Sequence, residues 1–270
     1  MGEAKKVLTK TVLNNVSYAI RGLLVALMLS SVTPFVYAQA LTEKTVEITT
    51  ADQFTLSAKL FSAAPSASGV LFLHDCQHSA QDYQPLYAAL VKQGFTVLAL
   101  DLRGYGDSQS ELFSEQKIRR QSEDIVSYQG QLAGLMLHWQ KDVLSALHYM
   151  QQALGNQQAI SVVTSGCSSN QAIYLAETNA INSIVMFAPE LSSADKEQFK
   201  QLSDMPIYLL SSKHQTEAML NAKELFDWSG DKNTVLQVLK GNLSAYQLLK
   251  QQPYLNEHVA TWLRNTLKDH

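Results

Sequence analysis

Residues 160–172 read ISVVTSGCSSNQA, and this stretch decides how the chain folds. The nearly continuous apolar run from Ile160 to Val163 is typical of a strand that is covered on both faces. The small polar residues after it predict a turn, and Ala172 and Ala176 have the spacing of one helix face. The stretch therefore predicts a buried strand, a sharp turn and a helix packed on the sheet.

The same alternation of strand and helix continues along the chain. Short apolar runs predict further strands at Val70 to Leu73, Thr96 to Leu100, Ile184 to Ala188, Ile207 to Leu210 and Val235 to Leu239. Helical spacing lies between them, for example at Leu220, Leu225 and Phe226, and again in a last helix from Tyr254 to Leu267. Thr45 to Thr49 and Phe54 to Phe61 instead alternate apolar and polar residues, which predicts an antiparallel pair. We expect an α/β fold with a mostly parallel, doubly wound sheet of about eight strands.

Residues 109–135 interrupt this alternation. The segment is polar, carries Arg119 and Arg120, and precedes the next core helix near His138. Two interpretations stay open, a small cap over the sheet and a surface insertion without a role in binding, because both have this composition.

The N-terminus resembles a secretory signal peptide. Lys5, Lys6, Lys10 and Arg21 precede an apolar stretch from Gly22 to Ala38, and Ala38-Gln39-Ala40 offers small residues to a signal peptidase. We expect residues 1–40 to be removed after Ala38 or Ala40, which leaves residues 41–270 as one domain without a membrane span in the periplasm or outside the cell. An uncleaved anchor is the alternative.

Composition excludes several partners and cofactors. The net charge is -3 and the pI about 6.2, so no basic face attracts nucleic acid. Apart from His74 and His214, the histidines are His78, His138, His148, His258 and His270. They show no metal-ligand spacing with carboxylates or thiols, and we expect neither a metal nor another cofactor.

Two motifs follow or end a predicted strand, Leu71-Phe-Leu-His-Asp-Cys76 and Asp101-Leu-Arg-Gly-Tyr-Gly-Asp-Ser108. Both resemble motifs of the α/β-hydrolase family, in its dienelactone hydrolase or serine aminopeptidase-like branch. Asp101-Leu-Arg-Gly-Tyr-Gly-Asp-Ser108 resembles the family's D-x-R-G-x-G-x-S turn, whose role is structural. Leu71-Phe-Leu-His-Asp-Cys76 resembles the strand that ends in H-G-x, with Asp75 in place of the glycine. In that comparison His74 is a structural histidine, and the carboxylate of Asp75 opposes an oxyanion.

The elbow of that family, G-x-S-x-G, aligns without a gap on residues 164–168. Gly166 then occupies the nucleophile position, and Thr164 and Ser168 occupy the two glycine positions. A shift by one residue brings Ser165 or Cys167 to the nucleophile position, but it turns the strand residues and the helix alanines to the wrong faces.

The other two triad positions lack their residues as well. Ser211 to Gln215 follows the strand that usually precedes the acid and contains no carboxylate, and Lys240 to Tyr246 contains no histidine. Because triad members act as a unit, this pattern indicates that Ser-His-Asp chemistry was lost. In a displaced arrangement, Glu190 is the candidate acid and His214 the candidate base. The plainer interpretation places both in surface loops.

The resemblance also implies a disulfide. Cys76 and Cys167 fall on the two positions whose N–H groups form the oxyanion hole in active relatives, so their backbones are expected to be close enough for a bond. Two free, buried thiols are the alternative.

The resulting functional expectation is an exported, catalytically degenerate α/β-hydrolase-fold protein whose pocket takes a small-molecule ligand or an envelope protein. The alternative is an active hydrolase of esters, thioesters or amides that uses Cys167 or Ser165. A third hypothesis is an interaction module built on residues 109–135.

Overall fold

The computed structural model describes residues 41–270 apart from 64–67, 156–158, 180, 203, 231 and 268–270. The expected signal peptide, residues 1–40, lies outside the described residues. Within the described part of the chain, no helix is long and apolar enough to cross a membrane.

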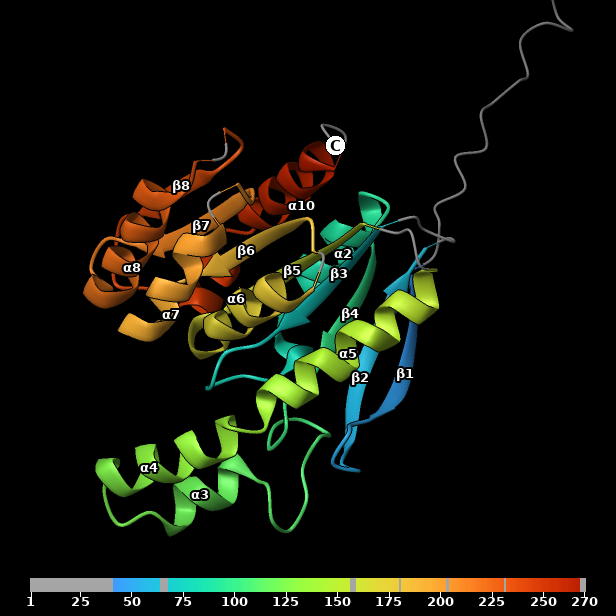
Figure 1. Cartoon of the computed structure of the whole chain (residues 1–270), viewed down its shortest axis with the longest axis vertical. Helices are drawn as coiled ribbons and strands as arrows, with labels where there is room; N and C mark the ends of the chain where they lie inside the picture. The colour runs from blue at the N-terminus through green and yellow to red at the C-terminus, as the bar shows by residue number, and fades with distance from the viewer. Residues whose placement is uncertain are drawn as a thin grey trace, which may run out of the picture. The chain divides into compact units, whose positions relative to one another are not determined.

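The described strands form a single sheet in the order β1-β2-β4-β3-β5-β6-β7-β8 (Figure 1). β1 pairs antiparallel with β2 and β2 antiparallel with β4, whereas all the remaining pairs are parallel. The strands are β1 (Thr42–Thr49), β2 (Thr55–Ser62), β3 (Ser68–Leu73), β4 (Thr96–Leu100), β5 (Ala159–Ser165), β6 (Ser183–Phe187), β7 (Ile207–Ser212) and β8 (Val235–Leu239). The expected fold class is confirmed.

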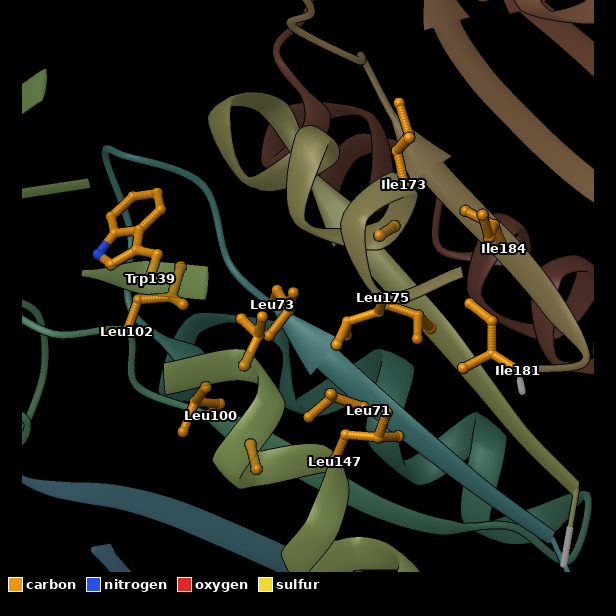
Figure 2. Packing of buried hydrophobic residues seen from close by; sticks show 14 of the residues in the cluster. Leu71, Leu73, Leu100, Leu102, Trp139, Leu147, Ile173, Leu175, Ile181 and Ile184 are labelled. Atoms are coloured by element: carbon orange, nitrogen blue, oxygen red, sulfur yellow. The ribbon is translucent and has the colours of Figure 1, made fainter. Parts of the chain in front are cut away.

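Helices cover both faces of the sheet (Figure 1), and the buried hydrophobic residues form two clusters, one of which is shown in part in Figure 2. One face packs against α5 (Trp139–Leu154), α6 (Ser169–Thr178) and α7 (Ser193–Phe199), and the other against α2 (Gln84–Lys92), α9 (Ala245–Gln251) and α10 (Tyr254–Thr266). The other helical segments are α3 (Glu115–Gln121), α4 (Ile125–Met136), α8 (Thr216–Trp228) and the 3-10 turns at Ala80–Tyr83, Gly166–Ser168 and Lys200–Leu202.

The buried face of α8 differs from the expected one. Leu220 is 49 % exposed and Phe226 39 % exposed, while Ala222 and Leu225 are buried. Leu220 lies about 140° around the helix axis from Leu225, so the two cannot share a face. The buried face of α8 carries Ala218, Asn221 and Ala222 beside Leu225, so helical spacing predicted Leu225 correctly but not Leu220 and Phe226.

The turn after β4 is held by side chains that the sequence singled out. Asp101 accepts hydrogen bonds from the N–H of Ala80 and of Asp107, both at 3.0 Å. Gly106 has φ 48°, and a Cβ atom there would lie 2.2 Å from the Asp101 carboxylate, so a side chain does not fit. This geometry agrees with a structural role for the turn.

Candidate functional site

The turn after β5 carries a glycine that lines a pocket. Gly166 begins the 3-10 turn Gly166–Ser168 with φ 55°, a left-handed conformation that favours glycine. A Cβ atom there would lie 3.2 Å from Asp75 Cβ and 3.3 Å from Glu190 Oε1. The turn therefore points an empty backbone position at two carboxylate side chains.

Asp75 brings a negative charge to the loop after β3. It is 7 % exposed, and its carboxylate accepts hydrogen bonds from the N–H of Gln77 (2.8 Å), from His78 Nδ1 (2.7 Å) and from Tyr83 Oη (2.8 Å). Burial raises the pKa of Asp75, but the hydrogen bonds from His78 and Gln77 outweigh it and leave the pKa below 3.8. An ionised carboxylate here opposes any oxyanion that forms beside Gly166.

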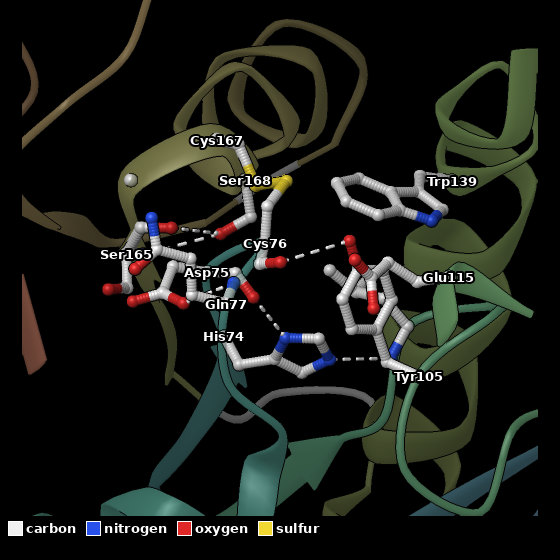
Figure 3. The surroundings of a disulfide bond; sticks show 12 residues. His74, Asp75, Cys76, Gln77, Tyr105, Glu115, Trp139, Ser165, Cys167 and Ser168 are labelled. Atoms are coloured by element: carbon white, nitrogen blue, oxygen red, sulfur yellow. Dashed lines mark hydrogen bonds between the residues drawn. A yellow bond between two sulfur atoms is a disulfide. The ribbon is translucent and has the colours of Figure 1, made fainter. Parts of the chain in front are cut away.

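His74 is part of the scaffold. It is fully buried, its Nδ1 lies 2.7 Å from the carbonyl oxygen of Asp75, and its Nε2 accepts the N–H of Leu102 at 3.0 Å (Figure 3). Burial lowers the pKa of His74, so the ring is neutral and ties the loop after β3 to the loop after β4.

Cys76 and Cys167 form a disulfide, with Cα atoms 5.9 Å apart, as the resemblance implied (Figure 3). The bond joins the loop after β3 to the turn after β5. Because both sulfur atoms are used, Cys167 offers no thiolate in this state.

Ser165 does not face a base. It is fully buried at the end of β5, and its Oγ lies 2.9 Å from Tyr83 Oη, which also donates to Asp75. The hydroxyl of Ser165 is thus held in a buried network with a tyrosine and a carboxylate.

The structure separates the other two candidates. His214 is exposed just before α8, its backbone N–H donates to the carbonyl oxygen of Gly241 at 3.0 Å, and it does not line the pocket beside Gly166. Glu190 does line this pocket, and its N–H donates to the carbonyl oxygen of Gly166 at 3.3 Å. Burial of its carboxyl group, followed by the charges of Asp75 and Glu217, raises the pKa of Glu190.

The pocket beside Gly166 has a volume of about 190 Å³. Its acidic lining residues are Asp75, Glu190 and Glu217, and no lysine, arginine or histidine is among the described residues that line it. No residue of 109–135 lines it either. In the described part of the chain, no three His, Cys, Asp or Glu side chains are arranged so that they could hold a metal ion, and this includes the three carboxylates of the pocket.

Three residues of the site were not predicted from the sequence, namely Tyr83, His78 as a partner of Asp75, and Glu217, which lines the pocket. Tyr83 meets Ser165 across 82 residues of chain, so no local pattern announces the contact. The position of His78, three residues after Asp75, was the one available signal.

The His78–Asp75 pair predicts a pH dependence of stability. Its hydrogen bond to Asp75 raises the pKa of His78 above 6.5, although burial and Lys250 oppose the shift. A native pKa above the unfolded value means that this stability is complete below the unfolded pKa and is lost as pH rises through the native pKa. We expect wild type to lose about 1 kcal/mol relative to His78→Gln between about pH 6 and about pH 9. Urea unfolding of both proteins across this range measures it, and parallel curves would contradict it.

Comparison with known proteins identifies the family. A family model described as serine aminopeptidase, S33, matches residues 64–243, which is more than half of the chain. The chain belongs to this family of α/β-hydrolases. No curated protein matches the sequence.

Solved structures agree with this fold. An esterase from Pyrococcus furiosus is similar with a TM-score of 0.62 and 17% identity over 83% of this chain and 93% of that chain. A dienelactone hydrolase from Anabaena variabilis is similar with a TM-score of 0.63 and 12% identity over 85% and 98%. The esterase domain of a Rhodothermus marinus protein is similar with a TM-score of 0.60 and 13% identity over 83% of this chain and 99% of that chain. Likeness at these identities concerns the fold alone.

Proposed function

We propose that this chain is an exported α/β-hydrolase-fold protein without Ser-His-Asp catalysis, and that the pocket beside Gly166 holds a small ligand or a segment of an envelope protein. The observation that carries the proposal is the turn after β5, where a glycine with φ 55° stands at the position that faces the pocket. Export rests on the signal-like N-terminal sequence.

The neighbouring groups support the absence of catalysis. Acyl transfer needs a nucleophile within hydrogen-bond reach of a base, and it needs donors for a developing oxyanion. Cys167 forms a disulfide with Cys76, and the hydroxyl of Ser165 is hydrogen-bonded to that of Tyr83. Neither residue has a histidine partner. The carboxylates around the pocket favour an uncharged or positively charged ligand over an anionic one.

Reactivity tests the proposal. Pure protein should not hydrolyse p-nitrophenyl acetate, p-nitrophenyl butyrate or alanine p-nitroanilide above the buffer rate, and neither a fluorophosphonate nor iodoacetamide should label it. Gly166→Ser should stay equally inert, because a hydroxyl at the turn still has no base. Stoichiometric labelling of Ser165 or Cys167 with matching loss of turnover would instead establish the active hydrolase of esters, thioesters or amides.

The pocket is tested in the same protein by ligand-observed NMR. Short alkylamines should bind more strongly than alkylcarboxylates of equal length, and Glu217→Lys should weaken the amines. Glu47→Lys, an exposed change on β1, is the matched control. Equal binding of amines and acids, or equal effects of the two variants, would contradict a pocket of this charge.

A further inference from the structure

α4 is packed on one side only. Tyr128 Oη donates to Glu115 Oε1 at 2.8 Å, and Gln131 Nε2 donates to Ser122 Oγ at 3.3 Å, so this side of α4 faces α3. Within α4 only Leu135 is buried. Figure 1 shows α3 and α4 as a helical pair that projects from the chain between β4 and α5. The opposite side of α4 has no packing partner among the described residues.

That opposite side carries an apolar stripe. Val126, Gly130, Ala133 and Leu137 lie within an arc of about 60° at 100° per residue, on the side away from Tyr128 and Leu135. We call these four residues the bare stripe. Val126 is 72 % exposed and Leu137 81 % exposed, and the sequence of α4, IVSYQGQLAGLM, contains no charged residue. A solvated helix face normally carries charges, so this face has the composition of a contact surface.

Neither steric crowding nor backbone conformation within the chain requires glycine at the two glycine positions of α4. A Cβ atom at Gly130 or at Gly134 would find no atom within 4 Å, and neither residue has a positive φ. A glycine inside an exposed helix costs about 1 kcal/mol relative to alanine. Close approach of a second backbone is the remaining physical use of a glycine at such a place.

The pattern of the bare stripe identifies its occupant. Along the helix its residues are large, small, small and large, at spacings of four, three and four residues. This order is the same when the helix is read from its other end. A second copy in the antiparallel orientation therefore presents a matching surface. We propose that the bare stripe pairs antiparallel with the same stripe of a second copy of this chain, about a two-fold axis between Gly130 and Ala133.

Three consequences follow from this pairing. The heptad-like spacing suits helices that cross at about 20°. Val126 meets Leu137 of the partner subunit, and the small residues meet at the axis. One pair of short helices buries less than the roughly 800 Å² per partner of a standard interface, so the dimer is weak and depends on concentration.

Sedimentation equilibrium from low to high micromolar protein concentration tests the pairing. The sample is the protein in the form that the cells producing it yield after processing. Val126→Lys and Leu137→Glu should each weaken dimerisation at least about tenfold. The double variant should recover wild-type association, because antiparallel pairing sets the two new charges opposite each other. Gln198→Lys, an exposed change on α7, should leave association unchanged. All three substituted positions are exposed, and circular dichroism checks that each variant folds.

Several results would overturn the proposal. A wild type that stays monomeric at every concentration excludes the dimer, and a double variant as weak as the single ones excludes the antiparallel register. If the monomer instead floats with phosphatidylcholine vesicles and Ala133→Glu abolishes this binding, the bare stripe contacts lipid and the dimer is wrong. Equal weakening by Gln198→Lys would show a non-specific charge effect and would also overturn it.

Discussion

Replacement of Arg103 by alanine should lower the free energy of unfolding by about 3 to 5 kcal/mol. The guanidinium group is 2 % exposed and bonds Asp142 Oδ1 at 2.6 Å and Asp52 Oδ1 at 2.9 Å. It also lies 4.3 Å from the ring centre of Phe54. Asp142 is fully buried, and burial raises its pKa to about 6 even with the cation beside it. Removing the cation leaves a buried carboxylate without its partner.

The pH dependence of this variant identifies the cause. Without the guanidinium, the native pKa of Asp142 rises further above its unfolded value, so the native state binds the proton more tightly. Stability is then greatest below the unfolded pKa and falls as pH rises toward the native pKa. Arg103→Ala should therefore lose less relative to wild type at about pH 5 than at about pH 8.

Two further variants complete this experiment. Arg103→Lys should fall between wild type and alanine, because an ammonium group cannot hold two carboxylates in the same bidentate geometry. Lys92→Ala is the matched control, since the Lys92–Glu257 pair is 70 % and 45 % exposed and contributes at most about 1 kcal/mol. If Arg103→Ala lowers the free energy of unfolding by less than about 1 kcal/mol, the ion pairs of Arg103 do not stabilise the fold as expected.

Loss of the Cys76–Cys167 disulfide should lower the free energy of unfolding by about 2 to 4 kcal/mol. The bond spans 91 residues, so it removes many conformations from the unfolded chain. Urea unfolding of wild type and of the double variant Cys76→Ala, Cys167→Ala measures the difference. Reductant should bring wild type to the stability of the double variant and leave the double variant unchanged.

Mass spectrometry under non-reducing conditions provides the independent check. Wild type should show no thiol that reacts with iodoacetamide before reduction and two thiols after it, because the chain contains two cysteines. Two reactive thiols in the untreated native protein would contradict the disulfide. A double variant as stable as wild type would show that the bond stabilises nothing.

Sequence alone determined the fold class and the positions of the strands along the chain. Strand periodicity and turn chemistry are local properties, so the runs at Thr96 to Leu100 and Ile207 to Leu210 identified buried strands. The resemblance also placed Cys76 near Cys167. On α8, Ala218 and Ala222 are buried while Leu220 and Phe226 are exposed. Helical spacing alone did not predict this difference.

Only the tertiary structure decided what surrounds Gly166. Asp75 and Tyr83 lie between β3 and α2, whereas Ser165 ends β5. The hydrogen bond between Tyr83 and Ser165 exists because the sheet order brings β3 beside β5. The same holds for the bare stripe, since the sequence shows that α4 lacks charge but not which side of it α3 covers. Local pattern specifies backbone conformation, whereas the partners of a side chain depend on which distant segments the fold places beside it.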